Sequence, residues 1–137
     1  MKIKDHLAYI IARVNKQLED ELQERLREVG LPIDQVRILE VLSDGDGLPM
    51  GELATQALVE PTTLTKMIDR MVADSLVLRL LDPNDRRRVL IALAPAGKLV
   101  LRRLNRITTS QEARLSKRLP KAKLGELRTL LRGLAEG

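Results

Sequence analysis

Three consecutive arginines, Arg86 to Arg88, stand between two short apolar runs in the stretch RLLDPNDRRRVLIAL. The residues DPND are turn formers, so the stretch predicts a β-hairpin with the arginines at its tip. Guanidinium groups pair with phosphates, and arginine suits the narrow, negative minor groove of DNA. The plainer explanation is that charge keeps an exposed hairpin tip in solution, and the neighbouring elements have to decide between the two.

The stretch EPTTLTKMIDRMVADS, directly before the hairpin, predicts a helix with two distinct faces. Its apolar residues recur every three or four positions, so they share the side that packs on a core. Its polar side carries threonines and basic residues, which can contact base edges and phosphates when such a helix enters the major groove. An ordinary surface helix is the alternative. The residues expected to contact DNA are Thr62, Thr63, Thr65, Lys66 and Arg70.

A helix and hairpin of this kind need a scaffold, and the rest of the chain supplies one. A long helical pattern ends at VGLP, and two shorter helices follow before the DNA-contacting helix. From Pro95 the helical period returns, and Pro120 divides a fifth helix from a sixth. The order predicts a mainly α fold of the α+β kind, a winged helix-turn-helix with flanking helices. We expect an N-terminal dimerisation helix over residues 1–31, the winged DNA-binding domain over 32–94 and C-terminal dimerisation helices over 95–137.

The first helix and the last two carry apolar stripes that their neighbours in the chain leave unsatisfied. In the last helix leucines recur at spacings of three and four, as in the seam of paired helices. Isolated amphipathic helices are marginally stable in water, so these stripes need a partner, and a second copy of the chain is the economical one. The residues assigned to a dimer interface are Leu7, Ile11, Leu127, Leu131 and Leu134.

The composition excludes several classes of protein. The 137 residues include no Cys and one His, which excludes disulfides, thiolate metal sites and thiol redox sensing. Because no nucleophile–base pair or phosphate loop is present, we expect no enzyme, no cofactor and no metal. No apolar run approaches the ~20 residues of a membrane span, and the N-terminus lacks the features of a signal peptide. A cytoplasmic, nucleoid-associated protein without membrane contact is therefore expected.

The net charge of +5 is unevenly distributed along the chain. Residues 95–137 hold eleven basic and three acidic groups, so the excess lies in the C-terminal third. An isoelectric point near 9.9 points toward nucleic acid, although a solvated helix face or a symmetric interface explains it as well.

The segment ELATQALVEPTTLTKMIDRMVADSLVLRLLDPNDRRRVLIALAPAG resembles the MarR family of bacterial transcriptional regulators. The resemblance extends into the first two predicted helices, and it therefore covers nearly the whole chain. In the winged segment the family pattern is matched in register by Glu52-Leu53-Ala54, Thr63-Leu64-Thr65, Asp69-Arg70, Leu76-Val77, Arg79, Asp82, Asp85-Arg86-Arg87, Leu93 and Gly97. In the first two helices the matching residues include Arg13, Gly30-Leu31 and Gln35.

Two departures from the family pattern predict local consequences. Ser75 stands where the family usually has glycine, so the turn after the DNA-contacting helix is expected to be strained or differently shaped. Pro32, Pro49 and Ala94 stand where a serine or threonine often caps a helix, and a side-chain cap contributes on the order of 1 kcal/mol. Three helix starts are therefore expected to be less firm.

The resemblance implies an obligate homodimer that binds a pseudo-palindromic operator in double-stranded DNA and usually represses nearby genes. It also implies a structural contact between Asp85 and an arginine, and a second arginine that enters the minor groove. We expect Arg86 to pair with Asp85 and Arg87 to enter the groove, because successive side chains of a strand point to opposite faces. Arg86, Arg87 and Arg88 are all kept as candidate DNA contacts.

Members of the family often release DNA when a small anionic, phenolic or lipophilic compound binds between the dimer helices and the winged domain. The candidate effector residues are His6, Tyr9, Arg13 and Arg37, the first three about one turn apart at the start of the chain. Ordinary interface packing is the alternative explanation for them. Two other functions stay open: an effector-independent or architectural DNA-binding protein, and a helical interaction module that has lost DNA binding.

Overall fold

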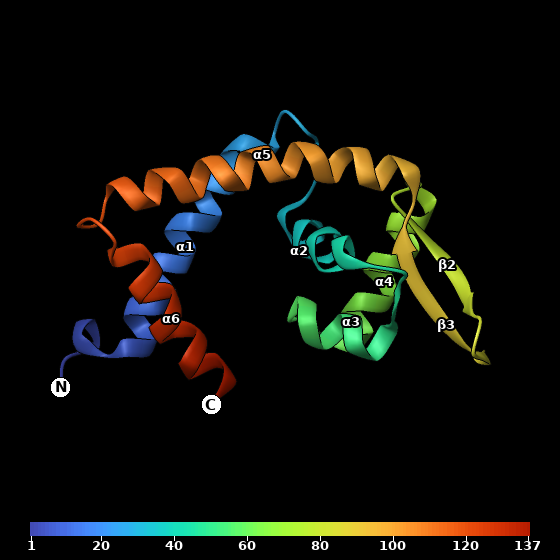
Figure 1. Cartoon of the computed structure of the whole chain (residues 1–137), viewed down its shortest axis with the longest axis horizontal. Coiled ribbons are helices and arrows are strands. Elements are labelled where there is room, and N and C mark those ends of the chain that lie inside the picture. Colours follow the sequence, from blue (N-terminus) through green and yellow to red (C-terminus); the bar gives the residue numbers. More distant parts are fainter.

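The computed structural model describes all 137 residues, and the chain forms an arch (Figure 1). Helix α5 spans the top, the winged part hangs from one end, and α1 and α6 occupy the other. The predicted order of six helices and one hairpin is confirmed. None of the helices has the length and apolar composition that crossing a membrane requires. The helices are α1 (Leu7–Leu26), α2 (Ile33–Val41), α3 (Met50–Ala57), α4 (Pro61–Ala73), α5 (Pro95–Lys117) and α6 (Lys123–Glu136), the strands are β1 (Leu48–Pro49), β2 (Val77–Asp82) and β3 (Asp85–Leu93), and the short 3-10 helices are η1 (Ile3–Asp5) and η2 (Leu42–Asp44).

One hydrophobic core holds the winged part together. It contains 16 buried residues, which run from Leu26 at the end of α1 to Leu104 in α5. The apolar face of α4 packs into this core as predicted, with Leu64, Ile68 and Met71 fully buried. Helix α1 contributes only its last residue, and α6 contributes none. The core therefore depends on α2 to α5 and the hairpin, and hardly on the other end of the arch.

Backbone geometry, and not side-chain caps, defines the helix boundaries. Helices α2, α3 and α5 begin after Pro32, Pro49 and Ala94, and none of these residues makes a side-chain cap, as the sequence predicts. Helices α3 and α4 end in Schellman turns, in which Leu58 and Ser75 adopt left-handed conformations with φ of 59° and 62°. Glycine accepts this conformation freely and other residues do not, so the strain expected at Ser75 is present.

The sheet has three antiparallel strands in the order β1-β3-β2. Strand β1 is not predictable from the sequence, because a two-residue strand is too short to show an alternating pattern. Gly47, with φ of 111°, lets the chain approach β3: a Cβ there would lie 3.1 Å from the carbonyl oxygen of Ile91. By pairing with β3, β1 fixes the position at which α3 begins.

Helix α5 leaves the wing through a contact that only glycine permits. Gly97, in the first turn of α5, lies so close to Leu76 that an added Cβ would come within 2.0 Å of the Leu76 carbonyl oxygen. The same oxygen accepts a hydrogen bond of 3.0 Å from the N–H of Ala94. This junction sets the direction of α5 relative to the hairpin, and thereby the shape of the arch.

Polar contacts hold the other end of the arch. Gln111 of α5 donates a hydrogen bond of 2.7 Å to the carbonyl oxygen of Leu18 in α1. Arg128 of α6 pairs with Glu112 of α5 at 2.6 Å, and no residue of α6 is buried. The stripe predicted on α6 and the first half of the one on α1 therefore remain exposed within one chain. The expectation that the stripe of α5 also lacks a partner in the chain is wrong, because Leu101 and Leu104 are buried in the core of the winged part.

Candidate nucleic-acid interface

The outward face of α4 carries the residues that the sequence assigns to DNA. Thr62, Thr63, Thr65, Lys66 and Arg70 are all exposed, and the opposite face of the helix is buried in the core. The Thr65 hydroxyl donates a hydrogen bond of 3.1 Å to the carbonyl oxygen four residues earlier, which leaves its oxygen and methyl group available to a base edge. Helix α4 thus presents hydroxyl and basic groups on one accessible face, as a major-groove helix does.

Local hydrogen bonds between aspartates and the backbone organise the wing tip. Asp85 accepts a hydrogen bond of 3.0 Å from the N–H of Arg87, and Asp82 accepts one of 2.9 Å from the N–H of Asn84. No ion pair joins Asp85 to the Arg86 side chain, so that expectation is wrong. The physical reason is that an Asx turn closes with the backbone two residues on and does not require a long side chain to be ordered.

The three arginines do not alternate about a regular strand. Leu81 pairs with Val89, but the next residue, Asp82, pairs with Asp85, so Arg86 to Arg88 have no partners on β2. They form a bulge in β3, and bulges change the direction of side chains. The predicted alternation, with Arg86 and Arg88 on one face and Arg87 on the other, therefore does not apply.

Arg88 differs from its two neighbours because it is paired within the molecule. Its Nη2 lies 3.1 Å from Oε1 of Glu52 in α3, which braces the wing against the helix pair. Arg86 and Arg87 are exposed and have no carboxylate oxygen within 4.0 Å. Two of the three wing arginines thus keep guanidinium groups that are free for a phosphate or a groove.

A second ion pair joins α4 to the wing. Arg79 of β2 pairs with Asp69 of α4, and both side chains are exposed. The sequence analysis places both residues in a family pattern but predicts no contact, because only the packing of the hairpin on α4 brings them together. An exposed ion pair contributes little to the free energy of folding. The effect of the Arg79–Asp69 pair is to orient the wing relative to α4, so that the two form one surface.

Comparison with known proteins identifies the family. The MarR family model matches residues 31–89, which span α2 to α4 and most of the wing. A crystal structure of a MarR-family transcriptional regulator from Silicibacter pomeroyi is 32% identical, covers 98% of this chain and 92% of that chain, and superposes with a TM-score of 0.80. This chain belongs to the MarR family. As a member of this family, the protein is a DNA-binding transcriptional regulator and not an enzyme.

Two other relatives of this regulator have informative names. The transcriptional repressor IacR of Pseudomonas putida is 26% identical over 128 residues, which cover 93% of this chain and 77% of IacR. CouR of Rhodococcus jostii RHA1 has a crystal structure with p-coumaroyl-CoA, which covers 98% of this chain and 95% of that chain at 21% identity and a TM-score of 0.86. A structure of CouR with a 23-mer DNA duplex has 24% identity, a TM-score of 0.86 and 98% coverage of both chains. At these identities CouR supports the fold alone.

A hollow of about 310 Å³ lies where α1 and α2 of the regulator meet the turn after α3. Arg37 lines it, but His6, Tyr9 and Arg13 do not, so one chain does not bring the four candidate effector residues together. Half-buried Glu40 lies in the same wall, and its burial raises the pKa of the carboxyl, while the charge of Arg37 opposes this with a smaller effect. Glu40 is not among the residues predicted for the site, because nothing in the sequence signals its burial. The complete lining is Glu19, Leu22, Ile33, Asp34, Val36, Arg37, Glu40, Ala57, Leu58 and Val59.

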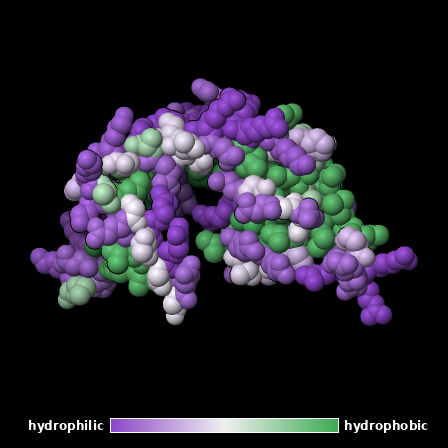
Figure 2. Space-filling model, in the orientation of Figure 1, coloured by the Kyte–Doolittle hydropathy of each residue, from purple (hydrophilic) through white to green (hydrophobic).

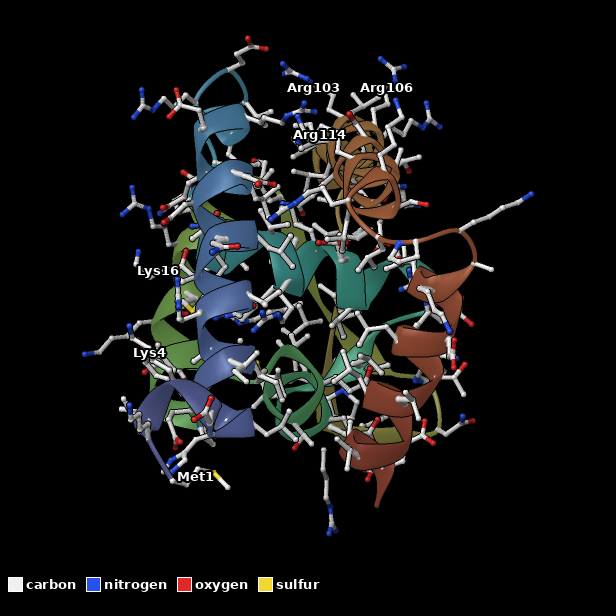
Figure 3. All side chains as sticks on the ribbon, turned by 90° about the vertical axis from the view of Figure 1, so that its left-hand side faces the viewer. Met1, Lys4, Lys16, Arg103, Arg106 and Arg114 are labelled. Carbon is white, nitrogen blue, oxygen red and sulfur yellow. The ribbon has the colours of Figure 1, made fainter.

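The residues assigned to a dimer interface are exposed in the single chain. They lie on α1 and α6, at the end of the arch that contributes almost nothing to the core. Figure 3 looks onto this end and shows the two helices standing apart. The exposed fractions are 57% for Leu7, 42% for Ile11, 39% for Leu127, 40% for Leu131 and 64% for Leu134.

Proposed function

We propose that this MarR-family protein is a homodimeric repressor of a pseudo-palindromic operator. In this proposal α4 of each protomer reads base edges in a major groove through Thr62, Thr65 and Lys66, and the wing reaches an adjacent minor groove through Arg86 and Arg87. The observation that carries the proposal is the single surface formed by the exposed polar face of α4 and two unpaired arginines beside it. The repressor IacR, which is similar over most of the chain, supports the direction of regulation.

The proposed dimer buries the aliphatic side chains of α1 and α6 against a second copy of the chain. Neither helix can satisfy its stripe within one chain, since α6 has no buried residue and α1 has only Leu26. Removing large aliphatic side chains from water contributes about 1.5–3 kcal/mol for each one fully buried. Two-fold symmetry in the protein then places two copies of α4 on two half-sites of the operator.

We also propose that a small amphipathic anion binds at the hollow beside Arg37 and releases the operator. The apolar lining, which includes Leu22, Val36 and Val59, suits a ring or hydrocarbon body, and Arg37 supplies the positive charge. Three carboxylates, of Glu19, Asp34 and Glu40, lie in the same wall, so a single anionic group facing Arg37 fits better than a polyanion. A role for His6, Tyr9 and Arg13 in effector binding would require the partner protomer or a ligand that extends beyond the hollow.

The alternatives lead to different observations. An effector-independent or architectural binder would keep its affinity for DNA in the presence of every small molecule that is tested. A helical interaction module would bind no DNA, and the exposed Arg86 and Arg87 argue against this function. The CouR structures with a DNA duplex and with p-coumaroyl-CoA show that a protein of this fold can bind both kinds of ligand.

Selection of bound sequences from a pool of random duplex DNA tests the main proposal. We expect one motif with two-fold symmetry, whose half-sites lie about 10 base pairs apart or a multiple of that spacing. The selected duplex then serves as the probe in a screen of aromatic carboxylates and their thioesters, in which a true effector lowers DNA affinity. An asymmetric motif would contradict the homodimer on a palindrome, and failure to enrich any sequence would contradict specific operator binding.

A further inference from the structure

A strip of basic side chains covers the outer face of α5, on a part of the molecule that the proposed operator contacts leave unused. We call it the α5 ridge. All of its side chains are exposed, and none has a carboxylate oxygen within 4.0 Å. The only acidic residue of α5, Glu112, is already paired with Arg128 of α6. The ridge consists of Lys98, Arg102, Arg103, Arg106, Arg114 and Lys117.

Helical geometry places four of the six ridge side chains on one side of α5, and Arg103 and Arg114 lie next to that side. At 3.6 residues per turn, Lys98, Arg102, Arg106 and Lys117 fall within a sector of about 100° around the helix, opposite to the buried Leu101 and Leu104 side. With a rise of about 1.5 Å per residue, the strip is roughly 28 Å long. Figure 2 shows hydrophilic residues along this upper edge of the arch, and Figure 3 shows Arg103 and Arg106 pointing outward from α5.

The ridge and the wing tip lie on different sides of the molecule. In Figure 1, α5 forms the top of the arch, whereas the tip of the β2–β3 hairpin extends away from α5 on the lower side. A duplex held by α4 and the wing therefore does not pass along the ridge. A ligand of the ridge would therefore be either a second molecule or a distant segment of the same duplex.

The centre of the ridge is its most positive part. At one end, Lys98 and Arg102 share a hollow with Asp44 and Asp46. Toward the other end, Arg114 shares one with Glu21 and Glu24. Neither hollow includes Arg103 or Arg106, which have no carboxylate oxygen within 4.0 Å, and these two are the residues on which a test should concentrate.

We propose that the α5 ridge binds the phosphate backbone of a second DNA duplex without regard to sequence, so that one regulator bridges two duplex segments. Four of the six basic side chains are arginines, whose planar groups pair with phosphate oxygens in a bidentate manner. An acidic protein fits less well, because protein interfaces depend on buried apolar and aromatic anchors, and Leu99 is the only large apolar side chain exposed beside the ridge. The ridge does not pair with the same ridge of a second copy, since two ridges would repel one another.

A bridging assay with the full-length protein tests the proposal, which goes beyond the operator-binding function. A 40-base-pair duplex of random sequence is fixed to beads and saturated with protein, and capture of a second, fluorescent duplex is measured at low and at physiological salt. The ridge variant is Arg103→Gln/Arg106→Gln/Lys117→Gln. The matched control is Lys2→Gln/Lys4→Gln/Lys121→Gln, which removes the same charge from exposed residues outside α5 that form no ion pair. A conservative variant, Arg103→Lys/Arg106→Lys, preserves the charge.

We expect the wild-type protein, the control and the conservative variant to capture the second duplex, and the ridge variant to capture less than a fifth as much. Protein retained on the beads should be equal for all four, which separates a failure of the ridge from a failure of DNA binding as such. Equal capture by the ridge variant would mean that the winged parts of two protomers do the bridging, and it would overturn the proposal. The proposal would also be overturned if the wild-type protein captured no second duplex, or if the ridge variant were not retained on the beads. It would be overturned as well if polyglutamate displaced the second duplex more effectively than unlabelled DNA of equal charge, because that would indicate an acidic protein partner.

Discussion

The two ends of the arch differ in how their helices are stabilised. The winged end buries 16 residues in one core, and its helices pack on one another from several sides. At the other end α6 buries none of its residues and α1 buries only Leu26, where it joins the winged end. Both ends have strongly amphipathic sequences, so hydrophobic patterning alone does not distinguish them. The difference is whether the chain itself supplies a surface for the apolar face.

This contrast indicates that the two ends respond to different perturbations. A change in the core of the winged end should reduce its own stability whether or not a partner is present. A change at the apolar face of α1 or α6 should act through association, because the single chain leaves that face in water. Five tests follow in order of expected effect, and the first two address these two modes of stabilisation directly.

The largest effect is expected for Leu131→Lys in the leucine stripe of α6. A charge left unpaired in a buried interface costs about 3–5 kcal/mol, which corresponds to more than a hundredfold weaker dimerisation. Sedimentation should show wild type at twice 15.4 kDa and the variant at 15.4 kDa at micromolar concentration. The winged end should remain folded, as judged by hydrogen exchange at Leu64 and Ile68. A wild-type chain that sediments at 15.4 kDa at micromolar concentration would remove the argument for a dimer.

The next largest effect is expected for Gly97→Ala, compared with Gly133→Ala as its control. An alanine Cβ at position 97 would lie 2.0 Å from a backbone oxygen, whereas one at position 133 in α6 meets nothing within 4 Å. We expect Gly97→Ala to destabilise the winged end by about 1–3 kcal/mol through overpacking. Gly133→Ala should raise the helicity of α6 slightly, because alanine favours helix by about 1 kcal/mol over glycine. Urea denaturation of both variants measures the difference, and similar behaviour of the two would contradict the close contact at Leu76.

Substitutions of the wing arginines should distinguish a residue that binds DNA from one that holds the wing in position. Arg87→Ala should weaken binding to the selected operator by about tenfold and reduce the salt dependence by about one counterion per protomer, with no change in stability. Arg88→Ala removes the pair with Glu52 and should alter the orientation of the wing more than the number of counterions released. Binding isotherms across a salt series measure both quantities. Identical salt slopes for wild type and Arg87→Ala would mean that this arginine only keeps the tip in solution.

Ser75→Gly should stabilise the winged end. The residue has φ of 62°, a left-handed conformation that costs about 1–2 kcal/mol for residues other than glycine. Removing this cost is partly offset, because glycine has more conformational freedom in the unfolded chain. We therefore expect the free energy of unfolding to rise by about 1 kcal/mol. Thermal unfolding of the Leu131→Lys monomer should show the same gain, since the turn after α4 belongs to the core. A decrease in stability would indicate that the Ser75 side chain makes an unrecognised contribution.

The smallest effect is expected for Glu40→Gln at the hollow between α1 and α2. The folded state raises the pKa of this carboxyl above its ordinary value of 4.5, chiefly because burial penalises the charged form. The native state therefore binds the proton more tightly than the unfolded state, and Glu40 makes the protein less stable as pH rises through the raised pKa. The variant should be slightly more stable than wild type at neutral pH, and the difference should disappear below about pH 4. Denaturation curves of the variant and the wild type at neutral pH and below about pH 4 test this. A difference in the free energy of unfolding that is the same at both pH values would assign the effect to Arg37 instead.

Much of the winged end is predictable from local pattern. The three- and four-residue spacing of Leu64, Ile68 and Met71 predicts both the helix and its buried face, because one face of a regular helix repeats at that interval. DPND predicts the hairpin, since its residues favour turns in any context. Strain at Ser75 follows from a single residue standing where glycine is usual.

The arrangement of the arginines is less predictable, because it depends on register and not on residue type. A three-residue bulge moves Arg86 to Arg88 out of the regular pleat, and the partner of Arg88 is Glu52, 36 residues earlier in the chain. Similarly, Arg79 and Asp69 meet only because the hairpin folds back on α4. Local pattern carries no information on such pairings, so the expected Asp85–Arg86 contact was wrong although both residues lie at the tip.

The sequence by itself determined the helices, the hairpin, which side of α4 is polar and exposed, and the apolar stripes of α1 and α6, because each depends on the spacing of residue types along a short segment. Only the tertiary structure decided which charges are paired, that Glu40 is half buried beside Arg37, and that Arg103 and Arg106 point outward from α5. The last of these depends on the direction in which α5 leaves the hairpin. A close contact between Gly97 and Leu76 sets that direction, and such a contact exists only after distant segments have packed.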